Sequence, residues 1–309
     1  MPCKSFKAPS RRAVPLLTLA LLAPLGLSSP AVADRLDEIR TAGKLVLGYR
    51  PDARPFSYKD DAGTPAGFSV TLCQKVAEAI KTELKLLGLT VEWSPVPVDN
   101  RTPALQQGKI DLLCGPDAVT LSRREDVSFS IPIFASGVGA IVRSDSPTAL
   151  REVLEGKPAT GPVWRGSPAR ILQKKIFAVV KGTTSEAWIA ERLQAFQLDA
   201  SVTPVENYAA GIKAVTKGQA DVFFGDRAII MEAGGPGITA GELVPVDRLY
   251  TREPIALSMA RDNDNLRLVV DRGLSRFYRS PDFHTLYLKT FGEPTSGAML
   301  FYQVSALPD

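Results

Sequence analysis

Short apolar runs of strand length alternate with amphipathic helical segments along this chain. The first series contains an apolar run at Lys44–Tyr49, a helical stretch with Val76 and Ile80 on one face, and further strand-like runs at Val91–Val96 and Ile110–Cys114. Strands that alternate with helices of this length are typical of mainly parallel sheets covered by helices on both faces. The chain is therefore expected to be an α/β protein, and 309 residues are enough for one large core or two modest ones.

The same alternation restarts in the second half. Ile176–Val180 is a β-branched run, and Thr183 and Glu186 after it have the spacing of a capping box at the start of a helix. A further helix at Asn207–Lys217 precedes a strand at Asp221–Gly225. The pattern predicts a second α/β unit.

A last strand and two amphipathic helices, within 255–291, are predicted to return to the first unit. Two chain crossings would then join the units, and a cleft between two hinged lobes is a common place for a ligand. The stretch Ala159–Ala169 is rich in Pro, Gly and Ser and predicts an inserted surface loop, which could contact a partner. The predicted division is lobe 1 (34–134 and 254–309) and lobe 2 (137–250), with crossings near 133–136 and 251–254.

The N-terminal 33 residues have the pattern of a secretory signal. A basic segment with Arg11 and Arg12 precedes an apolar run at Ala13–Leu27, and Ala31-Val32-Ala33 is a small-x-small cleavage site. The segment holds four of the 37 basic residues and no acidic residue, so the mature chain has 37 − 4 = 33 basic and 33 acidic residues. Export to the periplasm with cleavage after Ala33 is expected, and the remaining charge favours no nucleic-acid partner.

Two cysteines, Cys73 and Cys114, remain after cleavage. An oxidising compartment permits a disulfide between them, and two buried free thiols are the alternative.

Patterns of catalytic or cofactor-binding residues are absent from the sequence. His284 is the only histidine, and no cluster of His, Cys and Asp has metal-ligand spacing. No nucleophile elbow, phosphate-binding loop or dinucleotide-binding glycine pattern occurs. Binding without a metal or cofactor is therefore favoured over catalysis.

Several stretches resemble one known family, the periplasmic amino-acid-binding proteins of ABC importers (bacterial extracellular solute-binding proteins, family 3). They include "GKLVLGYRPDARPFSY", "NRTPALQQGKIDLLCG", "TLSRREDVSFSIPIF", "VVKGTTSEAW" and "KGQADVFFGDRAII", and they span nearly the whole mature chain in order. The resemblance implies a type II two-lobed fold, a monomer that binds an amino acid, and a membrane permease as partner. "NRTPALQQGKIDLLCG" and "GTTSE" are closest to the glutamate/aspartate-binding branch.

The same resemblance implies roles for particular residues. Arg123 matches the arginine that holds the ligand's α-carboxylate, because a guanidinium group can bind both oxygens, and Arg124 would be solvated. The N–H groups of a helix start would close on that carboxylate. Asp226 matches the acid that takes the α-ammonium group. The residues whose N–H groups at the helix start would bind the α-carboxylate are Thr183, Thr184 and Ser185.

Arg50 and Arg101 match positions where the glutamate/aspartate branch binds the distal carboxylate, so the resemblance implies an acidic amino acid. Pro116 and Ala118 depart from the family pattern because they replace hydroxyl side chains that accept from the ammonium group. Asp117 is an added carboxylate that would replace them or face water, and Tyr208 replaces a histidine. Either the ammonium site is rebuilt, or the ligand is a dicarboxylate without a conventional α-amino group.

Tyr49 and Phe56 surround the loop after the first strand, where family members place an apolar wall on the ligand; the alternative is simple core.

Two other functions stay open. One is a periplasmic enzyme on the same scaffold, similar to cyclohexadienyl dehydratase, with Asp117 as a general acid. The other is an accessory or sensor subunit that binds a partner protein.

Overall fold

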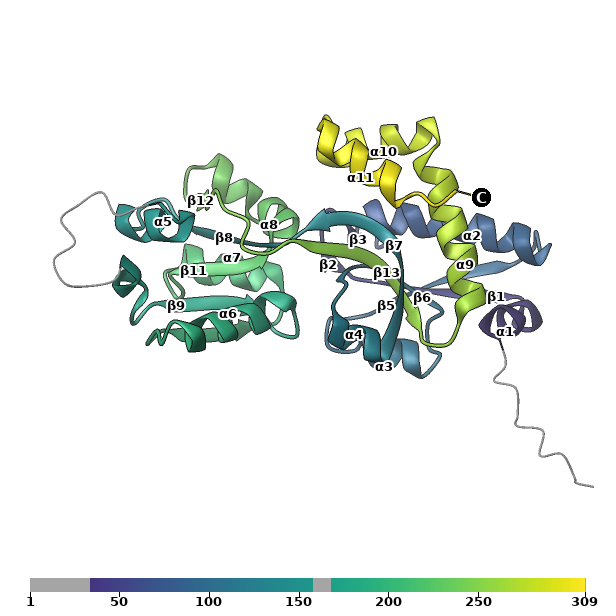
Figure 1. The fold of residues 1–309 in the computed structure, drawn as a ribbon, viewed down its shortest axis with the longest axis horizontal. Coiled ribbons are helices and arrows are strands. Elements are labelled where there is room, and N and C mark those ends of the chain that lie inside the picture. Colours follow the sequence, from purple (N-terminus) through teal and green to yellow (C-terminus); the bar gives the residue numbers. More distant parts are fainter. Residues whose placement is uncertain (1–33, 158–167, 309) are drawn as a thin grey trace, which may run out of the picture. The chain divides into compact units, whose positions relative to one another are not determined.

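The strands in the described part of the chain form two five-stranded sheets and one small three-stranded sheet (Figure 1). The computed structural model describes residues 34–157 and 168–308. The expected signal segment lies outside the described residues, and so does nearly all of the expected loop Ala159–Ala169. Among the described residues, no helix is long and apolar enough to cross a membrane.

The first sheet has the order β5-β1-β6-β13-β7, and only β13 runs against the other four strands. Leu45 and Leu47 point to one face and pack with helices α1, α2 and α9. Leu113 points to the opposite face, against α3. The bounds are β1 (Lys44–Tyr49), β5 (Thr90–Pro95), β6 (Leu112–Ala118), β7 (Val127–Ser136), β13 (Glu253–Ala260), α1 (Arg35–Ala42), α2 (Phe68–Leu84), α3 (Arg101–Gln106) and α9 (Asp264–Tyr278).

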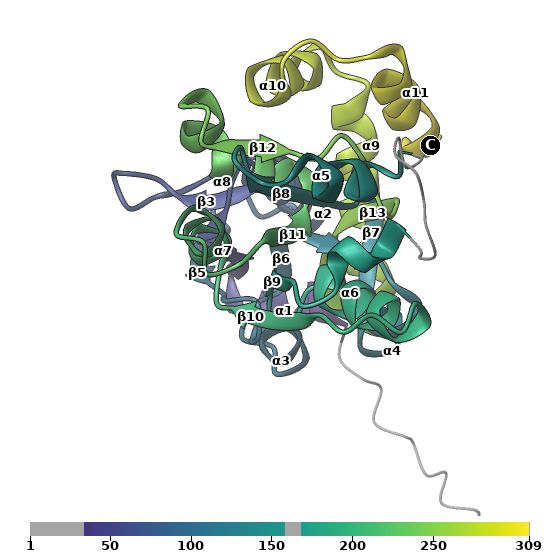
Figure 2. The ribbon, with the colours of Figure 1, turned by 90° about the vertical axis from the view of Figure 1, so that its left-hand side faces the viewer.

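The second sheet repeats this plan with the order β10-β9-β11-β8-β12, in which only β8 runs against the others. Phe177 and Phe224 pack with α5 and α6, whereas Ala178 and Phe223 point to the opposite face, which α7 and α8 cover (Figure 2). The bounds are β8 (Val138–Arg143), β9 (Ile176–Val180), β10 (Ser201–Val205), β11 (Val222–Asp226), β12 (Leu243–Pro245), α5 (Thr148–Glu155), α6 (Thr184–Ala195), α7 (Tyr208–Thr216) and α8 (Arg227–Thr239).

The remaining elements are short or C-terminal. Helix α11 was not expected from the sequence; its Tyr302 is buried and donates to the carbonyl of Ile133, at 2.9 Å. The bounds are β2 (Asp52–Ala53), β3 (Ser57–Lys59), β4 (Pro65–Ala66), α4 (Leu121–Asp126), η1 (Pro168–Leu172), α10 (Pro281–Phe291) and α11 (Ser296–Ser305).

Two crossings connect the sheets and lie side by side. Strand β7 ends at Ser136 and β8 begins at Val138, and the return crossing leads into β13. The Val138 N–H donates to the Thr251 hydroxyl, at 2.8 Å. A Cβ on Gly137 would lie 2.0 Å from the Thr251 carbonyl oxygen, so glycine is required for this close approach.

A disulfide joins Cys73 of α2 to Cys114 of β6, with the Cα atoms 6.0 Å apart. The expected disulfide is confirmed. Both cysteines belong to the first sheet and its helices, so the bond braces β6 and makes no link to the second sheet.

Candidate functional site

A narrow cavity of about 30 Å³ lies where residues of the first sheet meet helix starts of the second. Eight of the nine residues expected to bind a ligand line it, and Asp117 is the exception. The lining residues are Arg50, Arg101, Pro116, Ala118, Arg123, Thr183, Thr184, Ser185, Tyr208, Asp226, Ile229, Glu253 and Ile255.

Arg123 enters the cavity from the short helix α4. The Thr120 hydroxyl accepts from the Arg123 N–H, at 3.1 Å, and so caps the helix. The guanidinium group donates to the carbonyls of Ala118 at 2.9 Å and Gly182 at 3.3 Å. Burial lowers the pKa of Arg123, and the nearby Arg101 lowers it further. Among the described residues no carboxylate forms an ion pair with Arg123, so its charge is available to an anion.

Arg101, the first residue of α3, is held from two directions. One guanidinium nitrogen donates to the Gly182 carbonyl at 2.8 Å, and another lies 3.3 Å from the Asp117 carboxylate. Asp117 is buried and also accepts from the Ser258 hydroxyl, at 2.8 Å. Pro116 and Ala118 line the cavity, whereas Asp117 between them points to the opposite face of β6. Asp117 therefore orients Arg101 and does not line the cavity.

Arg50 follows β1 and is almost fully buried, with 3% of its surface exposed. Its guanidinium group donates twice to one oxygen of Asp52, at 3.0 and 2.8 Å. Its backbone N–H donates to the Ser57 hydroxyl, at 2.9 Å. The Arg50 side chain therefore lines the cavity while it forms an ion pair with Asp52.

The start of α6 contributes Thr183, Thr184 and Ser185. The expected capping box does not form: Glu186 accepts from the Gly182 N–H at 2.7 Å, and the Thr183 hydroxyl donates to the Val180 carbonyl. Gly182, directly before the helix, has φ +74°, a conformation that glycine adopts readily. The start of this 12-residue helix carries a partial positive charge and faces the cavity.

Asp226 is the N-cap of α8 and accepts from the N–H groups of Ala228 and Ile229, at 3.0 and 3.3 Å. Burial raises the pKa of the Asp226 carboxyl to about 6, although hydrogen bonds, first that of the Ser136 hydroxyl, lower it. Burial, and then the charge of Asp226, raises the pKa of the neighbouring Tyr208 hydroxyl.

Glu253 lines the cavity and was not expected from the sequence. It is the first residue of β13, at the second crossing, and accepts from the hydroxyls of Thr184 at 2.7 Å and Thr251 at 2.6 Å. The bond to Thr184 joins the first sheet to the start of α6. The signal available in the sequence was its place at the expected crossing 251–254, within reach of any ligand between the lobes.

The two aromatic residues expected at the cavity lie in the core. Phe56 is fully buried, 5.0 Å from the Phe134 ring, and Tyr49 packs edge-on against Trp93 at 6.4 Å. Neither lines the cavity. The sequence left a place in the core open as the alternative for these two rings, and both lie in the core.

Comparison with known proteins gives one family match. The model of the bacterial extracellular solute-binding proteins, family 3, matches residues 45–293. The chain is similar to the L-glutamate/L-aspartate-binding protein of Pseudomonas aeruginosa, with 28% identity over 92% of this chain and 89% of the relative. It is similar to an ABC transporter glutamine-binding protein of Bacillus subtilis, with 26% identity over 86% and 88% of the two chains.

Solved structures give the same fold. An ancestral amino-acid-binding protein, described as a precursor of cyclohexadienyl dehydratase, has a TM-score of 0.67 and 27% identity, covering 84% of this chain and all of its own. A cysteine-binding protein from Campylobacter jejuni has a TM-score of 0.68 and 19% identity, covering 85% and 96%, and shows the fold alone. The expected type II two-lobed α/β fold is therefore confirmed.

Proposed function

The chain belongs to family 3 of the bacterial extracellular solute-binding proteins, a family of amino-acid receptors for ABC importers, and from this we propose that it binds one amino acid between two lobes and delivers it to a membrane permease. The observation that carries the proposal is the arrangement of charges around one cavity. Arg123 and the start of α6 suit an α-carboxylate, and Asp226 and Glu253 suit an α-ammonium group.

Closure of the lobes is part of the proposal. The lobes are residues 34–134 with 254–309, and residues 137–250. The supporting contacts link them through the Gly182 carbonyl, which accepts from both Arg101 and Arg123, and through the bond between Thr184 and Glu253. A ligand that binds both lobes shifts the open and closed populations without covalent chemistry.

An acidic side chain is the first candidate for the rest of the ligand. Arg50 and Arg101 both reach the cavity and would donate to a distal carboxylate. The relative from Pseudomonas aeruginosa is named an L-glutamate/L-aspartate-binding protein. The Asp117 carboxylate holds Arg101 in place for this contact.

A neutral polar side chain is the second candidate, and a specific observation favours it. Both distal arginines already have an acidic partner: Arg50 has Asp52 and Arg101 has Asp117. Each pair is close to neutral, so the attraction for a second carboxylate is weaker than two free arginines would give. The glutamine-binding relative is similar over most of its length.

Titration calorimetry with the refolded protein tests both candidates. Refolding removes ligand that co-purifies. The panel is L-glutamate, L-aspartate, L-glutamine, L-asparagine and dicarboxylates without an amino group. Glutamate that binds at least tenfold more tightly than glutamine, about 1.4 kcal/mol, supports the acidic ligand, and the reverse order supports the neutral one.

Two further outcomes bear on the proposal as a whole. Dicarboxylates that bind as well as glutamate would contradict an ammonium site at Asp226 and Glu253. Turnover of a cyclohexadienyl substrate would overturn the receptor in favour of an enzyme. Asp117, the general acid that such an enzyme was expected to use, forms an ion pair with Arg101 outside the cavity lining.

A further inference from the structure

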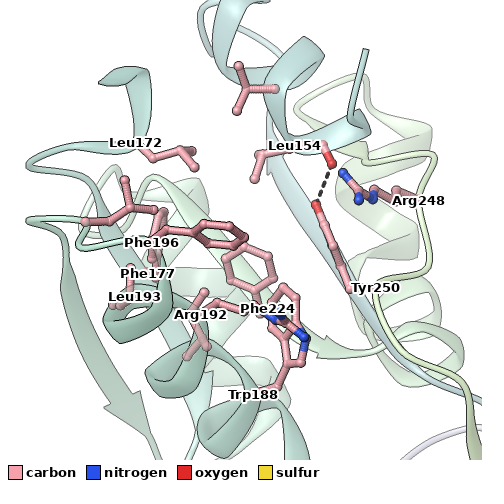
Figure 3. Close-up of a pocket in the computed structure, with 13 residues that line it drawn as sticks. Leu154, Leu172, Phe177, Trp188, Arg192, Leu193, Phe196, Phe224, Arg248 and Tyr250 are labelled. Carbon is pink, nitrogen blue, oxygen red and sulfur yellow. Dashed lines mark hydrogen bonds between the residues drawn. The ribbon is translucent and has the colours of Figure 1, made fainter. Parts of the chain in front are cut away.

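The second sheet carries a pocket that shares no residue with the cavity described above. It has a volume of about 490 Å³ and lies between α5, α6 and the sheet face that presents Phe177 and Phe224 (Figure 3). Pockets for small molecules span roughly 300 to 1,000 Å³. The pocket's lining residue Phe196 is exposed, so the space is open to a ligand from solvent.

Aromatic rings form much of the wall. Trp188 of α6 lies 5.7 Å from the Phe224 ring and 5.0 Å from the Tyr250 ring, and Phe224 lies 5.6 Å from Tyr250, all between ring centroids. Leucines of α5 and α6 complete the apolar surface. Such a wall binds a flat apolar body through burial and ring contacts.

The polar groups of the pocket are hydrogen-bond donors. The Arg192 guanidinium carbon lies 6.0 Å from the Trp188 ring centre, and that of Arg248 lies 5.3 Å from the Tyr250 ring centre. Within residues 34–157 and 168–308, neither guanidinium group forms an ion pair or donates a hydrogen bond. The Tyr250 hydroxyl already donates to the Leu154 carbonyl, at 3.0 Å (Figure 3).

No acidic residue is among the described lining residues, so no carboxylate of the wall balances these two positive charges. The neighbouring Glu155, at the end of α5, forms an ion pair with Lys157 at 2.5 Å. An aromatic wall with two unpaired arginines is complementary to a molecule with an apolar ring and a negative charge.

We propose that this pocket is a second ligand site of the protein, which binds a small aromatic carboxylate independently of the amino-acid cavity. The ring lies against Trp188, Phe224 and Tyr250, and the carboxylate accepts from Arg192 or Arg248. The two sites have no residue in common, so failure of one leaves the other intact.

Phenylacetate is the probe, measured by titration calorimetry and ligand-observed NMR on the full protein. We expect saturable binding that weakens at least about tenfold in the double variant Arg192→Gln/Arg248→Gln, because a hydrogen bond to a charged group is lost. The neutral analogue 2-phenylethanol should bind at least about tenfold more weakly than phenylacetate. Leu193→Trp, which fills the pocket, should abolish binding.

Arg151→Gln is the matched control, since Arg151 lies on α5 outside the pocket lining. Unchanged binding in this control, with unchanged thermal unfolding of all variants, supports the site. No saturation up to about 10 mM phenylacetate would overturn it. Unchanged affinity in Leu193→Trp, or equal affinity for 2-phenylethanol, would overturn it as well.

Discussion

At the scale of single residues, Arg123 and Arg124 are neighbours in sequence with different surroundings. Arg123 lines the cavity and donates to two carbonyls, whereas Arg124 is exposed. Arg123→Ala should weaken amino-acid binding by at least about thirtyfold, because loss of one partner of a buried charge pair costs about 2–5 kcal/mol. Calorimetry measures this, and Arg124→Ala, the matched control, should stay within about twofold of the wild type. Equal effects of the two substitutions would contradict the role of Arg123.

The raised pKa of Asp226 predicts a pH dependence. The unfolded chain releases this proton near pH 4, about the ordinary value for Asp, and the folded protein releases it at about 6. The contribution of Asp226 to the free energy of unfolding is therefore full below pH 4 and is lost as the pH rises from about 4 to 6.

The affinity for the amino acid should depend on pH in the opposite direction, because the ligand's ammonium group needs the ionised carboxylate of Asp226. Affinity for the amino acid should fall as the pH is lowered through about 6, by up to about tenfold per unit, in titrations at stepped pH. Asp226→Asn keeps an N-cap side chain for α8. This variant should bind the amino acid weakly, with an affinity that does not change with pH in this range. An unchanged slope in that variant would assign the pH dependence to another group, such as Glu253.

At the scale of elements, the close packing of α7 on the second sheet depends on one glycine. A Cβ on Gly211 would lie 2.3 Å from the Phe223 ring, whereas a Cβ on the exposed Gly297 of α11 would lie 3.9 Å from the Thr295 hydroxyl oxygen, an ordinary contact. Gly211→Ala should lower the free energy of unfolding by about 1–3 kcal/mol through overpacking. Gly297→Ala should raise it by about 0.4–1 kcal/mol, because the unfolded chain loses conformational freedom. Denaturant unfolding measures both, and the same sign for the two variants would contradict this packing.

At the scale of the whole molecule, a ligand held by both lobes stabilises them together. Amino acid at 100 times its dissociation constant should raise the free energy of unfolding by about 2.7 kcal/mol. Scanning calorimetry should then show the entire transition moving to higher temperature. In Arg123→Ala the same concentration should give a much smaller shift. A ligand-induced shift in only part of the transition would contradict binding by both lobes.

Local patterns in the sequence determined most of the elements. The two series of alternating strands and helices were predicted from such patterns, and the disulfide between Cys73 and Cys114 from the expected oxidising compartment. The places of Arg123 and Asp226 at the cavity were implied by the family resemblance. Strand and helix periodicity depends on neighbours a few residues away, so it can be read directly from the chain. The return of the last strand to the first unit was also expected, and β13 lies in the first sheet, whereas the order of the strands was not predicted.

The family resemblance predicted eight of the residues that line the cavity, but only the tertiary structure excluded Asp117 and Phe56 and added Glu253. Asp117 points away from it because β6 alternates and Pro116 occupies the facing position, and Phe56 packs against the rings of Phe134 on β7 and Phe291 on α10. Glu253 reaches Thr184, which is 69 residues away in sequence. These contacts join segments far apart in the chain, and burial and packing between elements, which no local pattern encodes, set their geometry.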